Sequence, residues 1–177
     1  MRHFVELPEA EVTAVVSDRQ AAGVHERARA HGIRSEFVGR QRREAPGGLL
    51  GVLRKYEPDL VVLAGYLKLI PADVLEAFPA RVVNIHPALL PKFGGPGMYG
   101  RHVHEAVVAA GETETGITIH LADARYDEGR TLFQATCPVA PDDTPAEVAT
   151  RVLELEHRHY PRVVAAYLAQ LDSGPGA

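Results

Sequence analysis

Asn84 and His86 are the two residues of this sequence whose types and spacing are best suited to chemistry. They lie two residues apart in an apolar run, and side chains with this spacing on an extended chain point the same way. An amide supplies a hydrogen-bond donor and an imidazole titrates near neutrality, so the pair could hold a carbonyl oxygen that becomes an oxyanion. A second interpretation stays open, in which His86 is a packed histidine at a capped strand end.

Asp127 is the third candidate, because a carboxylate can orient a histidine or stabilise its charged form. It stands two residues before Gly129 in a polar segment, where aspartate is also typical of an ordinary turn. The residues alone leave both interpretations open.

Other patterns are interpreted without a catalytic role. His102 and His104 have the spacing of metal ligands on a strand, but a helix is predicted to begin there, and residues two apart on a helix diverge. We therefore expect no metal site. Cys137 is the only cysteine, which excludes an internal disulfide and indicates a reducing compartment, the cytoplasm. The charged cluster at 40–44 is expected to be a solvated face.

Apolar runs that alternate with helical patterns must position these residues. Strands are expected at 12–16, 60–63, 82–85, 117–120 and 133–139, because short β-branched runs between Asp, Gly or Pro are typical of buried strands. Helices are expected at 23–31, 47–56, 74–78, 104–110 and 145–171, the last broken or kinked at Pro161. The alternation predicts an α/β fold with a mainly parallel sheet, which binds ligands at the carboxyl ends of its strands.

Composition and charge exclude several classes of protein. The 177 residues include 19 Lys and Arg against 23 Asp and Glu, and a net charge of −4 offers no basic face for nucleic acid. No apolar run approaches the ~18 residues that a membrane span needs, and the first residues lack the pattern of a signal peptide. We expect one domain over 1–172 and a disordered tail at 173–177.

Four ordered motifs resemble those of a known enzyme family. The segment 83–93 has the sequence VNIHPALLPKF. It resembles the signature of the folate-dependent formyltransferases. The run Gly116-Ile117-Thr118-Ile119-His120, followed by Asp127 and Gly129, resembles the second signature of that family. The segments 63–67 and 154–161 are similar to those of its phosphoribosylglycinamide formyltransferase branch.

The resemblance implies a Rossmann-like, three-layer formyltransferase fold with a mainly parallel sheet. It also implies transfer of a formyl group from the co-substrate 10-formyltetrahydrofolate to the amine of glycinamide ribonucleotide, in purine biosynthesis, without a metal. Asn84, His86 and Asp127 match the catalytic residues. The other matching positions are Arg42, Leu67, Lys68, Leu69, Ile70 and Asn84 for the folate, and Glu156 for the nucleotide.

The beginning of the chain departs from the family's pattern, because a first strand and a glycine-rich phosphate loop have no counterpart before Val12. We therefore expect an N-terminally shortened catalytic domain. Two alternatives remain. One is another formyl-transfer enzyme, such as formyltetrahydrofolate hydrolase or methionyl-tRNA formyltransferase, and the other is a folate-binding protein without catalysis.

Overall fold

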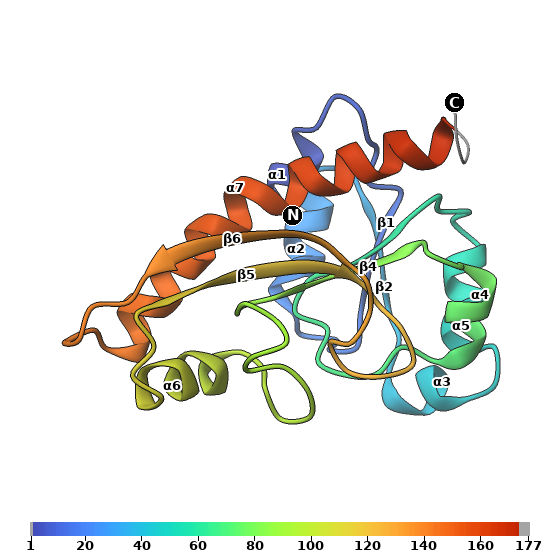
Figure 1. Cartoon of the computed structure of the whole chain (residues 1–177). Helices are drawn as coiled ribbons and strands as arrows, with labels where there is room; N and C mark the ends of the chain where they lie inside the picture. Colours follow the sequence, from blue (N-terminus) through green and yellow to red (C-terminus); the bar gives the residue numbers. More distant parts are fainter. Residues whose placement is uncertain (1, 174–177) are drawn as a thin grey trace.

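Strands and helices alternate along residues 2–173, the part of the chain that the structure, a computed structural model, describes (Figure 1). The strands are β1 (Ala14–Ser17), β2 (Arg34–Phe37), β3 (Val61–Leu63), β4 (Val82–His86), β5 (Glu114–Leu121) and β6 (Thr131–Pro138). The helices are α1 (Arg2–Val5), α2 (Gly23–Ala30), α3 (Arg40–Glu44), α4 (Gly48–Arg54), α5 (Ala72–Ala77), α6 (Arg101–Ala109) and α7 (Pro145–Asp172). Of the tail predicted at 173–177, only Ser173 lies within the described residues.

The apolar patterns predict most of these elements but miss α1, β2 and α3. β2 has the sequence Arg-Ser-Glu-Phe and is mostly exposed, so it lacks the apolar run by which the other strands are recognised. It forms because it pairs with β1, with Ala14 opposite Arg34 and Ser17 opposite Phe37. Pairing with a neighbour therefore overrides a weak local preference here.

The strands form two sheets, and these confirm the α/β class. β1 and β2 pair in parallel, and the second sheet has the order β3-β4-β5-β6. Within it β3 and β4 are parallel, whereas β4–β5 and β5–β6 are antiparallel. Leu121 at the end of β5 pairs with Val83 near the start of β4. The segment after β5 therefore does not begin beside the carboxyl end of β4.

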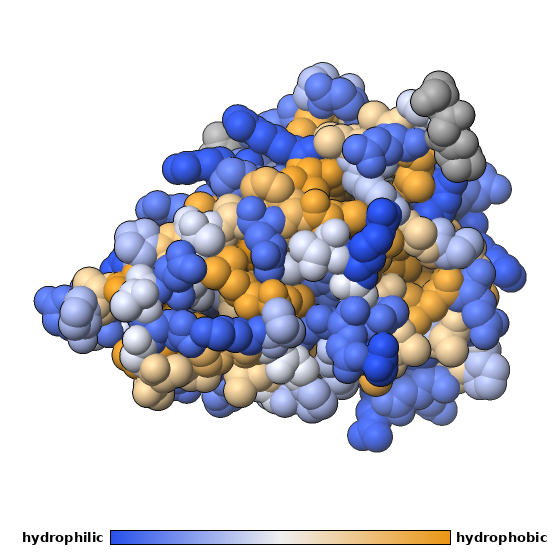
Figure 2. All heavy atoms as spheres, in the orientation of Figure 1, coloured by the Kyte–Doolittle hydropathy of each residue, from blue (hydrophilic) through white to orange (hydrophobic). Residues whose placement is uncertain are grey.

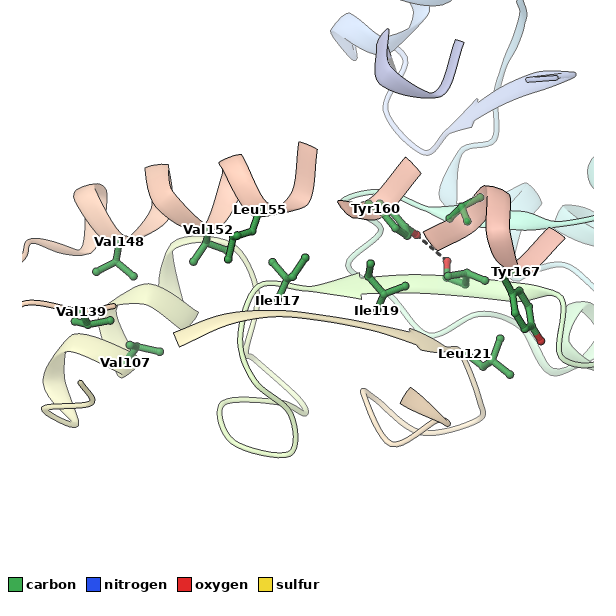
Figure 3. Close-up of a cluster of buried hydrophobic side chains, with 12 residues drawn as sticks. Val107, Ile117, Ile119, Leu121, Val139, Val148, Val152, Leu155, Tyr160 and Tyr167 are labelled. Carbon is green, nitrogen blue, oxygen red and sulfur yellow. Dashed lines mark hydrogen bonds between the residues drawn. The ribbon is translucent and has the colours of Figure 1, made fainter. Parts of the chain in front are cut away.

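Helix α7 lies along the second sheet and covers its main core (Figure 1). Figure 3 shows its apolar side chains facing Ile117, Ile119 and Leu121 of β5. They recur at helical spacing, as expected for a helix with one apolar face. The buried residues of α7 are Val148, Val152, Leu155, Tyr160, Pro161, Val164 and Tyr167.

The predicted break at Pro161 is wrong, because α7 runs uninterrupted from Pro145 to Asp172. A proline inside a helix costs about 3 kcal/mol, since it removes one hydrogen bond and its ring crowds the preceding turn. Pro161 is itself buried, and Tyr160 and Val164 beside it are 4% exposed. Burying one apolar side chain stabilises by about 1.5–3 kcal/mol, so packing on the sheet offsets the local cost.

A second core lies under α4 and α5 and supports the segment that follows β3. Its buried residues are Val38, Leu49, Leu50, Val52, Leu63, Ile70, Val74 and Val82.

On the face drawn in Figure 2, apolar residues gather below α7 and along β6, and hydrophilic residues surround them. Between residues 2 and 173, no helix combines the length and the apolar character needed to cross a membrane.

Candidate active site

Asn84 and His86 lie on β4 and face the antiparallel strand β5. Asn84 stands opposite His120, and His86 stands opposite Thr118. Residues directly opposite on an antiparallel pair share one face of the sheet and contact each other. His86, His120 and Thr118 are all at most 3% exposed, so this face is shielded from water.

Asp127 reaches the same face from the loop between β5 and β6. Its Oδ2 atom lies 3.4 Å from Nδ1 of His86 and accepts the Gly95 N–H at 3.0 Å. Its φ of 58° is left-handed, a conformation that aspartate adopts more readily than most residues. The structure thus brings Asn84, His86 and Asp127 together.

His120 is a site residue that the sequence analysis did not single out. Its Nδ1 atom lies 2.9 Å from the Leu121 carbonyl oxygen, which can only accept, so Nδ1 donates. Its Nε2 atom lies 3.1 Å from the Asn84 amide nitrogen. The same Nε2 lies 3.5 Å from Oδ1 of Asp127. The available signal in the sequence was a titratable residue at the end of a β-branched run.

Burial and ion pairing act in opposite directions on the pKa of His86. Burial lowers this pKa, while the Asp127 carboxylate and the Phe93 carbonyl raise it, and the net pKa lies below the ordinary value of 6.5. Burial raises the pKa of Asp127, but contacts with His120, Gly95 and His86 outweigh it, and the net pKa is lowered. Asp127 is therefore a carboxylate at neutral pH, poised to stabilise a proton on His86.

The loop that follows β4 holds the imidazole of His86 in place. Its Nε2 donates to the Phe93 carbonyl oxygen at 2.7 Å. Thr118 binds the segment after His86, since its hydroxyl accepts the Leu90 N–H at 2.9 Å and donates to the Ala88 carbonyl at 2.7 Å. His86 therefore has a fixed orientation, which a catalytic imidazole requires.

The stretch Leu67–Ile70 follows β3, and its two middle residues, Lys68 and Leu69, line a cavity of about 690 Å³. Leu67 and Leu69 are 44% and 43% exposed, whereas Ile70 is buried in the second core. Lys68 lines the cavity and pairs with Asp18. The stretch thus has one anchored end and two exposed apolar side chains, which suits contact with a flat, partly apolar ligand.

Arg42 agrees with the solvated face predicted for 40–44, whereas Arg43 does not. Arg42 is exposed and lies 3.8 Å from Glu36, and it is not among the residues that line this cavity. Arg43 does line the cavity but is 8% exposed, and it pairs with Asp18 at 3.6 Å and Glu44 at 3.0 Å. For Arg43 the prediction is wrong, because two carboxylates compensate the burial of its charge.

Glu156 lies apart, in a second cavity of about 700 Å³ between α6 and α7. Burial alone raises the pKa of its carboxyl group, and no hydrogen bond or ion pair of this side chain is found within residues 2–173. His104 lines the same cavity. Burial lowers the pKa of His104, and so does the charge of His86. Among the described residues, no group of three His, Cys, Asp or Glu is placed to hold a metal.

The lowered pKa of His104 predicts a pH-dependent stability. Because its pKa lies below 6.5 in the folded state, the unfolded state binds more protons in the window between the two values. The stability contributed by neutral His104 is present above pH 6.5 and is lost as pH falls through that window. Unfolding in urea should therefore show that His104→Gln gains stability relative to wild type as pH falls below about 6.5.

His102→Gln on the same helix is the control, since His102 is exposed and its contacts are an ion pair with Glu105 and an edge-to-face contact with the Tyr99 ring. A stability difference between wild type and His104→Gln that stays constant over this range contradicts the prediction.

The chain is similar in sequence to known formyltransferases. A family model described as Formyl transferase matches residues 5–164. Over 161 residues the chain is 47% identical to "Phosphoribosylglycinamide formyltransferase, chloroplastic" of Arabidopsis thaliana. The aligned region covers 88% of this chain and 55% of that protein. With 51% of the Vigna unguiculata protein covered as well, the chain spans about half the length of these curated relatives.

Solved structures show the same likeness over most of their length. The phosphoribosylglycinamide formyltransferase of Bacillus halodurans has a TM-score of 0.85 and 30% identity, with 96% of this chain and 90% of that chain covered. The enzyme of Streptococcus pneumoniae TIGR4 has a TM-score of 0.82 and 36% identity, with 94% and 91% covered.

Proposed function

The chain belongs to the formyl transferase family, and from this premise we propose that it transfers the formyl group of 10-formyltetrahydrofolate to the amine of glycinamide ribonucleotide, in purine biosynthesis. The observation that supports this best is the buried contact of 3.4 Å between His86 and Asp127, beside the amide of Asn84. An imidazole, a carboxylate and an amide at one point are suited to acyl transfer.

In the proposed reaction the substrate amine attacks the formyl carbon, and the electron pair of the C=O bond moves onto oxygen. Protonated His86 and the Asn84 amide stabilise this oxyanion. When the intermediate collapses, the bond between the formyl carbon and the folate nitrogen breaks. That nitrogen gains a proton and the amine loses one, which gives tetrahydrofolate and the N-formyl product. Asp127 stabilises the charge on His86.

The Phe93 carbonyl marks the place of the formyl oxygen in this proposal. It is itself a carbonyl oxygen that accepts from Nε2 of His86. Binding of the substrate then requires the loop around Phe93 to move, so that the Phe93 carbonyl oxygen leaves this position. Gly95 and Gly97 have φ of 92° and 84°, which only glycine adopts without strain, so the loop has the backbone freedom to do so.

We assign the two cavities to the two substrates. The folate is proposed to lie along Leu67–Ile70, with Arg42 near its acidic tail, and the ribose of the nucleotide is proposed to bind Glu156. The unpaired carboxylate of Glu156 suits an uncharged partner that donates, such as a hydroxyl. We propose the cytoplasm as the compartment, although the plant relatives are described as chloroplastic.

The test is to incubate the purified chain with 10-formyltetrahydrofolate and glycinamide ribonucleotide and to follow tetrahydrofolate and the formylated product. Product that depends on both substrates supports the proposal. Formate released without the nucleotide indicates a hydrolase, and formylation of methionyl-tRNA indicates the tRNA enzyme. Calorimetric titration with each substrate completes the test, because folate binding without turnover indicates a non-catalytic protein.

A further inference from the structure

We propose that Tyr160 is a positioning residue. Through one buried hydroxyl group it fixes the positions of the folate-binding stretch Leu67–Ile70, of Asn84 and of Glu156 relative to one another. The inference rests on the proposed function, because it assigns a role to the elements that contact the two substrates. Tyr160 belongs to α7 and does not itself contact a reacting atom.

The hydroxyl of Tyr160 lies between the carbonyl oxygens of two neighbouring strands. It is 2.8 Å from the Leu63 oxygen and 3.0 Å from the Val83 oxygen. Figure 3 shows Tyr160 pointing from α7 toward the sheet, with its hydrogen bond dashed. Leu63 ends β3, and the folate-binding stretch begins four residues later at Leu67, whereas Val83 directly precedes Asn84. One group thus joins the two points at which the chain enters the site.

The same side chain joins both strands to the nucleotide side. Glu156 precedes Tyr160 by four residues, so the two lie one above the other on the same face of α7. The ring of Phe4 packs against Tyr160 edge to face, with centroids 5.4 Å apart. Tyr160 is 4% exposed, so water cannot replace its hydrogen bonds. A shift of α7 relative to β3 and β4 would therefore move Glu156 relative to Asn84.

The chemistry of the hydroxyl suits this role. Both neighbours are carbonyl oxygens, which only accept, so the single phenolic proton is shared between them. Burial raises the pKa of Tyr160 well above its ordinary value, and the group stays a neutral donor at any physiological pH. Replacing Tyr160 by phenylalanine removes the hydroxyl group and leaves the ring packed, but it releases β3 and β4 from α7.

Tyr167 provides a matched control on the same helix. Its hydroxyl also donates to a backbone carbonyl, that of Ala80, at 2.8 Å, and the residue is 7% exposed. Ala80 lies before β4 begins, at the end of the strand away from Asn84 and His86. Tyr160→Phe and Tyr167→Phe thus remove the same group from similar surroundings, but only Tyr160 binds residues of β3 and β4.

The experiment compares both variants with the full wild-type chain in steady-state formyl transfer, thermal unfolding and amide hydrogen exchange. We expect Tyr160→Phe to lower kcat/KM about tenfold, because small misplacements of reacting groups are costly, with Tyr167→Phe within about twofold of wild type. Both variants should lower the melting temperature by similar amounts. Amides of 64–70 and 84–86 should exchange faster in Tyr160→Phe only.

Equal activity and equal exchange of the two variants would overturn the inference, since the hydroxyl would then contribute to stability alone. A wild-type chain that transfers no formyl group would instead contradict the proposed function. Hydrogen exchange at 64–70 and 84–86 still decides on Tyr160 in that case, so the two failures are distinguishable.

Discussion

Replacement of His86 by alanine is expected to lower turnover in the formyl-transfer assay by about 10²–10³-fold, the typical cost of losing a donor to an oxyanion. The imidazole is 3% exposed and held between Phe93 and Asp127, so no other side chain can take its place without rearrangement. Its proton stabilises charge that develops only in the transition state. The loss should therefore fall on kcat, while KM for the folate changes little.

His102→Ala is the control for this experiment, because His102 is exposed on α6. It should keep wild-type turnover. Calorimetric titration with the folate establishes that the His86 variant still binds it. If the variant retains more than about a third of wild-type turnover, His86 does not stabilise the oxyanion.

Replacement of Asp127 by asparagine should lower kcat by about 10²-fold or more and should also change its pH dependence. In the proposed mechanism the active form of His86 is protonated, so turnover should fall as pH rises through the pKa of His86. Asp127 raises that pKa against the effect of burial. Without the carboxylate the pKa of His86 falls further, and the loss of turnover should begin at a lower pH than in wild type.

The pH profile of kcat and an NMR titration of His86 measure both parts of this prediction. Asp123→Asn is the matched control, since Asp123 lies in the same loop but binds only the Arg125 N–H, at 2.8 Å. Its profile should coincide with that of wild type. A profile of the Asp127 variant that is lower but unshifted would show that the carboxylate does not act through the charge of His86.

The other predictions test the surroundings of the cluster. His104→Gln addresses burial of a neutral imidazole, and Tyr160→Phe addresses the fixed distance between α7 and the strands. Neither residue was assigned a role from the sequence. Both are recognised only once the structure shows what surrounds them.

Local patterns determined much of this protein. The apolar runs predict β3 and β4, and the two-residue spacing of Asn84 and His86 places both on one face, because alternation is a property of any extended backbone. The motifs at 83–93 and 116–129 predict a family that the match to residues 5–164 shows. These features depend on neighbours in sequence, so they can be read before any tertiary contact is known.

Only the tertiary structure decided how distant residues meet. The antiparallel pairing of β4 with β5 places His120 beside Asn84, and the loop after β5 must fold back for Asp127 to reach His86. A Cβ atom on Gly129 would lie 1.8 Å from the Leu121 carbonyl oxygen, so that close return needs glycine. Pairing direction and loop path depend on which surfaces are buried together, and burial is decided by the whole chain rather than by local spacing.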